Sequence, residues 1–271
     1  MNFSDKTKKR LENFKATIFP NLGNGQWKKN KKYYPHILPE DSKLYNLLPT
    51  YRDVLIEYIN KQHIKLHSDF HHLNSSQAMC LNFFFPFFKE KQMKLITDFI
   101  GFSDETIDYN TVAFEKHGLE AKLRRRPTYF DFYFETTSGK KLYFEIKYTE
   151  GSFGKAIVNS NKFDNVYSKF LKPLNNSFHS EQEFFNNFQI LRNLIHIDDN
   201  SFVVFVYPQD NRGIRRDAER VKSDFLNSTY HNNFFSVTWE MLFESVYSST
   251  KNTTISKQLD DFKAKYLPEQ L

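Results

Sequence analysis

The first third of the chain places its apolar residues at helical spacing. Between residues 44 and 67 these positions form one stripe, which predicts an amphipathic helix. A second helix is expected to begin after Ser75, a residue type that caps helix N-termini, and to end where Pro86 interrupts it. A third helix is expected over residues 89–100, before a glycine.

The middle of the chain changes to a period of two. Residues 128–136 and 141–149 alternate between apolar and polar, and the polar segment between them contains Gly139, so the pattern predicts a β-hairpin. Further strands are expected over 111–116, 201–207 and 234–238, and further helices over 156–170, 181–196, 239–247 and 255–266. This order predicts an α/β fold, a sandwich with a central mixed β-sheet flanked by helices.

Alternation also assigns a face to each side chain of the hairpin. On its first strand, Phe130, Phe132 and Phe134 are expected to share one face. Acids are depleted in strands, so carboxylates on the other face need an explanation. The charged residues assigned to that face are Asp131 and Glu135 on the first strand and Glu145 and Lys147 on the second, and Glu135 is expected to lie beyond reach of the metal.

The length of the hairpin loop decides whether these three side chains meet. A two-residue turn would place Asp131 opposite Ile146, on the wrong face. A three-residue loop with Gly139 in the left-handed conformation would place Asp131 opposite Glu145 or Lys147. We therefore expect the three-residue loop.

Two carboxylates and a lysine at one place can support phosphodiester hydrolysis. The carboxylates repel each other, and a hard divalent cation such as Mg²⁺ removes that repulsion. The metal can generate hydroxide near neutral pH, and a lysine beside it can orient the attacking water and neutralise the transition state. The expected cofactor is Mg²⁺, for which Mn²⁺ can substitute.

The spacing of these residues resembles a known group of nucleases. Asp131 followed after thirteen residues by Glu145-Ile146-Lys147 is similar to the motif of the PD-(D/E)XK superfamily, which includes many restriction and repair endonucleases. Phe130 stands where the name motif has proline. The segments that resemble a restriction-endonuclease branch of that superfamily are 75–77, 144–150, 153–154, 189–193 and 205–208, so the resemblance spans about residues 70–240.

The resemblance implies a restriction-endonuclease-like fold and roles for the matched positions. Asp131 and Glu145 would be metal ligands, the backbone carbonyl of Ile146 a third ligand, and Lys147 the catalytic lysine. The spacing alone is a weak signal, because salt-bridged exposed hairpin faces produce it often. The longer string and the order of elements favour the nuclease.

Five further residues are candidates for the same site. Glu57 would be an additional helix-borne acid or an ordinary exposed carboxylate. Gln77 and Gln189 would contact the scissile phosphate, order the lysine or make satisfied polar contacts. Arg192 would clamp a phosphate. Glu150 would reach the metal, cap the chain or pair with the lysine.

The charge of the chain points to a polyanionic partner. Its net charge is +6 and its pI about 9.1, which favours encounter with nucleic acid without identifying it. Residues 1–40 are expected to form a basic arm or loop, and 41–271 a single PD-(D/E)XK nuclease domain. The basic residues expected to contact nucleic acid are Lys28, Lys29, Lys31, Lys32, Arg124, Arg125 and Arg126, and a further cluster comprises Arg212, Arg215, Arg216 and Arg220.

Composition and missing motifs narrow the class of protein. One cysteine, Cys80, cannot form an intrachain disulfide, and no apolar run is long enough to span a bilayer, so a cytoplasmic protein without membrane partners is expected. No P-loop, GxGxxG or GxSxG pattern is present, so ATPase, dinucleotide-dependent and serine-hydrolase chemistry lack support.

The sequence thus predicts a Mg²⁺-dependent endonuclease for double-stranded DNA, of restriction-modification or defence type. One alternative is an RNA or structure-specific nuclease of the same fold. Another is a non-catalytic DNA-binding module that has kept the fold but lost the reaction. Cleavage of both strands would favour a homodimer with two sites related by a twofold axis.

Overall fold

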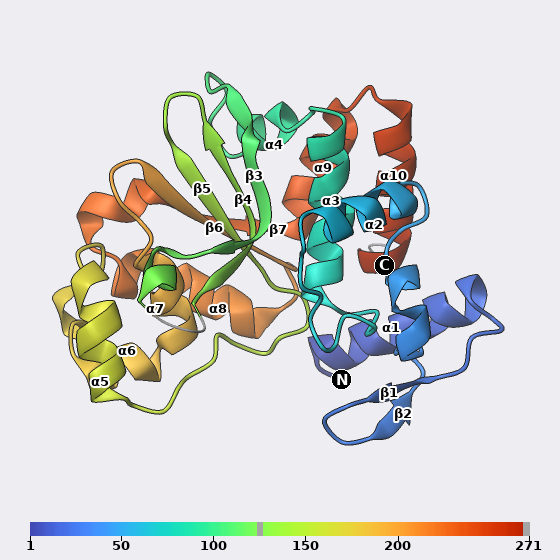
Figure 1. The fold of residues 1–271 in the computed structure, drawn as a ribbon, viewed down its shortest axis with the longest axis horizontal. Helices are drawn as coiled ribbons and strands as arrows, with labels where there is room; N and C mark the ends of the chain where they lie inside the picture. The colour runs from blue at the N-terminus through green and yellow to red at the C-terminus, as the bar shows by residue number, and fades with distance from the viewer. Residues whose placement is uncertain (124–126, 268–271) are drawn as a thin grey trace. The chain divides into compact units, whose positions relative to one another are not determined.

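A mixed sheet of five strands organises the middle of the chain (Figure 1). The computed structural model describes residues 1–123 and 127–267. In spatial order the strands are β3 (Ile107–His117), β4 (Tyr129–Thr136), β5 (Lys141–Ile146), β6 (Ser201–Tyr207) and β7 (Phe234–Thr238). The first three are antiparallel, whereas β5, β6 and β7 are parallel to one another. The predicted fold class, α/β with a central mixed sheet flanked by helices, is confirmed.

The chain divides into two compact units. Unit 1 comprises Met1–Ser103 and Trp239–Leu271, and unit 2 comprises Asp104–Thr238 with the whole five-stranded sheet. The parallel strands of unit 2 are joined through helices, as parallel strands require. These are α5 (Ser160–Lys162), α6 (Glu181–Asn186) and α7 (Phe188–Leu194) between β5 and β6, and α8 (Arg212–Arg220) between β6 and β7.

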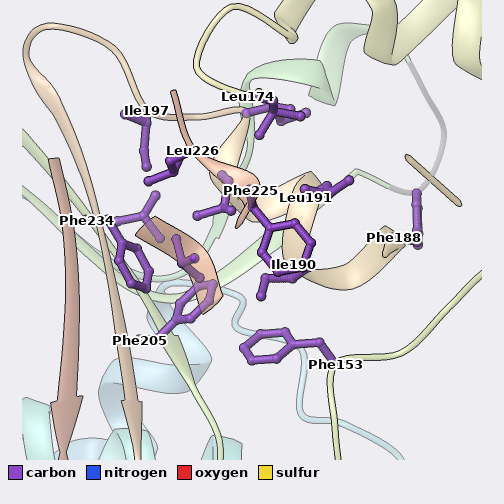
Figure 2. Packing of buried hydrophobic residues seen from close by; sticks show 14 of the residues in the cluster. Phe153, Leu174, Phe188, Ile190, Leu191, Ile197, Phe205, Phe225, Leu226 and Phe234 are labelled. Carbon is purple, nitrogen blue, oxygen red and sulfur yellow. The ribbon is translucent and has the colours of Figure 1, made fainter. Parts of the chain in front are cut away.

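The helices of unit 2 cover one face of its sheet with a largely aromatic core. Every second residue of β6 and the first residue of β7 contribute to this core, as alternation requires. Figure 2 shows Phe205 and Phe234 from these strands beside Ile190 and Leu191 of α7. Phe153, from the segment after β5, stacks on Phe205 with 4.8 Å between ring centroids. That contact ties the segment after β5 to the core.

The buried carboxylate of Glu120, after β3, contacts Thr128, the residue before β4, and His196. Glu120 is fully buried and accepts hydrogen bonds from the backbone N–H (2.7 Å) and the hydroxyl of Thr128. Its Oε2 lies 3.0 Å from Nε2 of His196, which is also fully buried. Burial raises the pKa of Glu120, but the bonds from His196 and Thr128 outweigh burial and hold it at about 2.

Unit 1 includes the basic N-terminal residues, which fold instead of forming the expected arm or loop. Lys15 is buried, and its ammonium donates to the carbonyls of Gly23 and Ile37, at 2.8 and 3.0 Å. The ammonium of Lys15 is therefore used in hydrogen bonds within the protein. The elements of unit 1 are α1 (Phe3–Ile18), β1 (Gly25–Trp27), β2 (Lys32–Tyr34), α2 (Arg52–Lys61), α3 (Ser76–Lys89), α4 (Lys94–Phe99), α9 (Trp239–Ser249) and α10 (Thr253–Tyr266).

Helix α3 begins as predicted but does not end at Pro86. Ser75 caps it, accepting a hydrogen bond from the backbone N–H of Ala78, and the helix continues past the proline to Lys89. Proline lacks the N–H that would bond to the carbonyl of Asn82. That carbonyl instead accepts a hydrogen bond from the side-chain amide of Gln258 at 2.8 Å. The orphaned acceptor is thereby satisfied, and the helix continues.

Other predicted helices are shorter or interrupted. In the segment 44–67 only α2 is α-helical, and His63 ends it in a left-handed conformation, with φ of 53°. The segment 181–196 forms two short helices, α6 and α7, which meet at Asn187. In the segment 156–170 the three-residue α5 is followed by a π-helical segment (Phe163–Tyr167) and a short 3-10 helix (Ser168–Phe170). The apolar residues of these segments keep helical spacing, but the α-helices stop at positions such as His63 and Asn187.

Candidate active site

The hairpin has the loop that brings its charged residues together. Strands β4 and β5 pair Phe132 with Phe144 and Glu135 with Lys141. The N–H of Thr136 donates to the carbonyl of Lys140, which leaves the three-residue loop 137–139 with Gly139 at φ of +89°. The predicted odd loop is therefore confirmed. The same register, continued by one residue, places Asp131 opposite Glu145.

The two strands separate at this position. Their last backbone pair is Phe132 with Phe144, and the N–H of Ile146 donates to the side chain of Asp131, at 2.7 Å from Oδ2. A carboxylate thus takes the place of a backbone acceptor where the strands diverge. The Asp131 carboxylate is fixed beside the backbone that joins Glu145 to Ile146.

Alternation along β4 breaks at Asp131, so the expected shared face of three phenylalanines is wrong for one of them. Phe132 contacts Phe134 and Phe144, with ring centroids 5.9 and 5.6 Å away. Phe130 instead packs against Tyr143 at 4.8 Å, in the core on the opposite face. A local twist between residues 130 and 132 explains the difference, because a β-irregularity re-aims side chains.

Strand β3 has a matching irregularity at Glu115, a residue that the sequence analysis did not single out. Phe114 is paired with Phe132 in the strand register, and their ring centroids lie 4.9 Å apart. Two positions later Lys116 lies over the ring of Tyr133, on the other face. Glu115 between them has φ of 56°, a left-handed value that is rare for a residue of its type in a strand.

The register places Glu115 beside Asp131. Phe114 pairs with Phe132 and Lys116 with Phe130, so Glu115 is the residue opposite Asp131. Both irregularities therefore fall on one pair of acids, next to Glu145. No local sequence signal predicts this pairing, because it depends on the register between β3 and β4 and on the left-handed backbone of Glu115.

Lys147 and Glu145 form an ion pair at the end of β5. Lys147 Nζ lies 2.8 Å from Glu145 Oε1, and both residues are less than 10% exposed. The backbone N–H of Lys147 donates to the carbonyl of Val206, which extends the parallel ladder to this residue. The ammonium also lies 5.1 Å from the centre of the Phe153 ring. Backbone, carboxylate and aromatic ring together fix this lysine.

The three charged groups influence one another strongly. Burial raises the pKa of Asp131 well above its ordinary value, and the carboxylates of Glu145 and Glu115 raise it further. Burial would lower the pKa of Lys147, but Glu145, Glu150 and Asp131 outweigh burial and raise it. The site therefore holds excess negative charge around a lysine that stays protonated at neutral pH.

This electrostatic arrangement predicts that Asp131 costs the protein stability. Its raised pKa in the folded state means that stability is lost as the pH rises through that pKa. Without divalent metal, Asp131→Asn is expected to increase the free energy of unfolding at pH 7, because asparagine can still accept the Ile146 bond. The gain should shrink as the pH falls towards the ordinary pKa of aspartate. Urea unfolding over this pH range would measure the difference, and an equal or lower stability at pH 7 would contradict the prediction.

The donor set fits a cation that is completed by substrate. Within residues 1–123 and 127–267, no group of three or more histidine, cysteine, aspartate or glutamate side chains is arranged to hold a metal. Mg²⁺ is commonly held by one or two carboxylates together with substrate phosphate, and it keeps several waters. Burial raises the pKa of Asp131 most, and repulsion from Glu145 and Glu115 raises it further; a bound cation would offset that repulsion. The residues present therefore fit Mg²⁺ better than a metal held by protein alone.

The five additional candidates occupy different environments. Glu150 accepts a hydrogen bond from the N–H of Tyr148 at 2.7 Å and raises the pKa of Lys147. Gln189 and Arg192 lie on α7. The backbone N–H of Gln189 donates to Gly154, and the guanidinium of Arg192 lies over the ring of Phe188. Glu150 thus caps the N–H of Tyr148 and acts electrostatically on Lys147. The bond from Gln189 joins α7 to the segment after β5.

The other two candidates belong to unit 1. Gln77 is buried, accepts from the N–H of His67 at 2.8 Å and donates to the carbonyl of Lys65 at 3.1 Å. These are the satisfied polar contacts that the sequence left as an alternative. Glu57 is exposed on α2.

The basic residues expected to bind nucleic acid are exposed where the structure describes them. Lys28, Lys29, Lys31 and Lys32 are all exposed in and beside the hairpin β1–β2 of unit 1. Lys28 pairs with Glu40 at 3.0 Å, and Lys29 lies 5.8 Å from the centre of the Trp27 ring. Arg124, Arg125 and Arg126 lie outside the described residues.

Comparison with known proteins identifies the family. Among the helices that the structure describes, none is both long and apolar enough to cross a membrane. No curated protein and no solved structure matches the chain. Residues 8–267 match the model of a family described as Restriction Endonuclease associating with ARP. Because this match covers nearly the whole chain, the protein belongs to that family of restriction endonucleases.

Proposed function

We propose that this protein is a Mg²⁺-dependent endonuclease of the PD-(D/E)XK type that hydrolyses phosphodiester bonds of double-stranded DNA in restriction or defence. The observation that carries the proposal is the convergence of three groups where β4 and β5 separate. Asp131 is bonded to the Ile146 N–H, and Glu145 is paired with Lys147. Membership of a restriction-endonuclease family supports the same activity and favours DNA as the substrate.

Asp131, Glu145 and the carbonyl of Ile146 are the proposed metal ligands. When bound, Mg²⁺ would supply a Lewis acid for the scissile phosphate and lower the pKa of a bound water. Asp131 is held ready by the Ile146 N–H, so the carboxylate keeps its orientation before substrate arrives. Preorganisation of this kind avoids a reorganisation cost during the reaction.

Lys147 acts as a donor and a positive charge in this proposal. Neighbouring carboxylates raise its pKa, so it carries its proton at neutral pH and is unsuited to act as a general base. Its ammonium can donate hydrogen bonds to a phosphate oxygen or to the attacking water, and it neutralises charge that develops on phosphorus. The centre of the Phe153 ring lies 5.1 Å from the ammonium, within the range of a cation–π contact that helps to hold it in place.

Cleavage of supercoiled plasmid and bacteriophage DNA would test this function. In Mg²⁺ the protein is expected to give discrete fragments, and EDTA should abolish cleavage because it removes the cation that the carboxylates hold. Single-stranded RNA and branched DNA would serve as parallel substrates. Cleavage of RNA or branched DNA alone would favour the alternative nuclease, and binding without any cleavage would favour a DNA-binding module.

Cutting of both strands also bears on the oligomeric state. A homodimer with twofold-related sites is expected to produce double-strand breaks with few nicked intermediates. Sedimentation of the protein on a short DNA duplex would determine the number of chains bound. Nicked circles as the main product, with one chain per duplex, would contradict the homodimer.

A further inference from the structure

Helix α8 is fixed to the segment that follows the catalytic lysine. Asn211 caps the helix, and its side-chain amide donates to the carbonyls of Tyr148 and Glu150, at 2.9 and 2.8 Å. Tyr148 directly follows Lys147, and Arg212 directly follows Asn211. A single hydrogen bond, from Asn211 to Tyr148, therefore joins the residue before Arg212 to the residue after Lys147.

Close packing adds to this attachment. A Cβ atom on Gly213 would lie 1.9 Å from the carbonyl oxygen of Gly151, so only glycine allows the helix to approach this closely. The N–H of Phe153 donates to Asp217 of α8 at 3.1 Å. Contacts at Asn211, Gly213 and Asp217 thus hold α8 against the segment that follows Lys147.

The exposed face of α8 is basic, and its arginines differ in their pairing. Ile214 and Ala218 are buried in the core of unit 2, which turns four arginines towards solvent. Two of the four are neutralised locally, because Arg215 pairs with Glu219 at 2.8 Å and Arg220 pairs with Asp224 at 2.6 Å.

The other two arginines, Arg212 and Arg216, lack a close ion pair with a carboxylate in the part of the chain that the structure describes. Arg216 is 3.8 Å from the neighbouring Asp217, and its side chain is 73% exposed. Arg212 is exposed and forms no ion pair with a carboxylate in the part of the chain that the structure describes. The two residues are four positions apart, so they lie on one side of the helix, about 5–6 Å apart at Cβ.

We propose that Arg212 and Arg216 bind backbone phosphates of the DNA next to the scissile phosphate. The inference rests on the proposed function, because the first turn of α8 is bonded to the segment that directly follows Lys147, beside the proposed place of cleavage. Arginine suits this task, since its guanidinium can bind phosphate through two hydrogen bonds. Such contacts set the position of the duplex on the protein and carry no sequence information.

The salt dependence of DNA binding tests this role. Anisotropy of a fluorescein-labelled 30-bp duplex would be measured in EDTA between about 50 and 200 mM salt, a range over which phosphate contacts change affinity steeply. Each phosphate contact contributes about 0.9 to the slope of log affinity against log salt concentration, so R212A/R216A is expected to reduce the slope by about 1.8. R212K/R216K should keep most of the slope and lose part of the affinity.

The matched control is R215A/R220A, which removes the same charge from the same helix. Because these arginines are already paired with Glu219 and Asp224, the slope is expected to change by less than half as much. Equal changes in the two variants would overturn the inference and indicate a general charge effect, and so would an unchanged slope in R212A/R216A or no binding of the duplex by wild-type protein.

Binding and cleavage measurements distinguish failure of this inference from failure of the proposed function. If wild-type protein binds the duplex with the expected slopes but never cleaves DNA in Mg²⁺, the phosphate contacts stand and the nuclease assignment fails. All four arginines are exposed, so the variants are expected to fold, and urea unfolding would check this.

Discussion

Replacing Asp131 by asparagine is expected to lower the rate of DNA cleavage in Mg²⁺ by about 10³-fold or more, because the variant loses the charge of a proposed metal ligand. Asparagine keeps an acceptor for the Ile146 N–H, so the fork between β4 and β5 should stay intact. The measurement is a single-turnover rate on plasmid DNA, together with the Mg²⁺-dependent shift in melting temperature. Both the rate and the shift should be lost.

Glu135→Gln is the matched control for this experiment. Glu135 lies on the same strand, accepts a hydrogen bond from the hydroxyl of Tyr133 and pairs with Lys141 across the hairpin. Its variant is expected to keep the rate within about threefold, because a conservative change away from the site has small effects. If Asp131→Asn retained more than a tenth of the wild-type rate, Asp131 would not be a ligand of the catalytic cation.

Replacing Glu120 by leucine is expected to reduce the free energy of unfolding by about 2–4 kcal/mol, because a buried donor left without an acceptor costs about 1–3 kcal/mol. The change leaves the N–H and hydroxyl of Thr128 without their acceptor and removes the partner of His196. Because folding lowers the pKa of Glu120 to about 2, the wild-type contribution is present above the unfolded pKa and is lost as the pH falls through 2. Urea unfolding at pH 7 measures the loss.

Two further variants separate this pair from charge in general. E120Q keeps an oxygen that can accept the two hydrogen bonds of Thr128, so it is expected to lose less stability than E120L. E219L breaks an exposed pair with Arg215 and should change stability by less than about 0.5 kcal/mol. A loss below about 1 kcal/mol in E120L would mean that the buried pair does not stabilise the β3–β4 connection.

Local sequence information was sufficient for the strands and for one register. The β-branched run of β6 and the alternating hairpin predicted the strands at the centre of the sheet. The glycine at 139 predicted the odd loop, which sets the β4–β5 register. Each prediction depended on residues close together in the chain, where turn geometry and alternation determine structure.

Contacts between distant residues account for the errors. Helix α3 passes through Pro86 because Gln258, far away in the chain, satisfies the carbonyl of Asn82. The basic N-terminus contains helix α1, whose Lys15 donates hydrogen bonds to the carbonyls of Gly23 and Ile37. Neither partner is recognisable from local composition.

The same distinction applies to the candidate site. Asp131, Glu145 and Lys147 share one hairpin, so their meeting could be predicted from spacing. Glu115 comes from the preceding strand, beyond a connection that Glu120 and His196 close. Its position beside Asp131 depends on that buried pair and on a left-handed backbone, which the residue type disfavours. The sequence therefore predicted the hairpin part of the site and missed the contribution of β3.

The bond from the Ile146 N–H to Asp131 makes one amide proton a spectroscopic reporter of the site. This proton faces a side-chain carboxylate instead of a strand carbonyl, so its chemical shift should follow the charge on that carboxylate. A ¹⁵N-labelled sample titrated with acid, or with Ca²⁺ in place of Mg²⁺, would register protonation and cation arrival at Asp131 through a single resonance. The state of the carboxylate could then be followed in the resting protein, with no DNA present and no turnover.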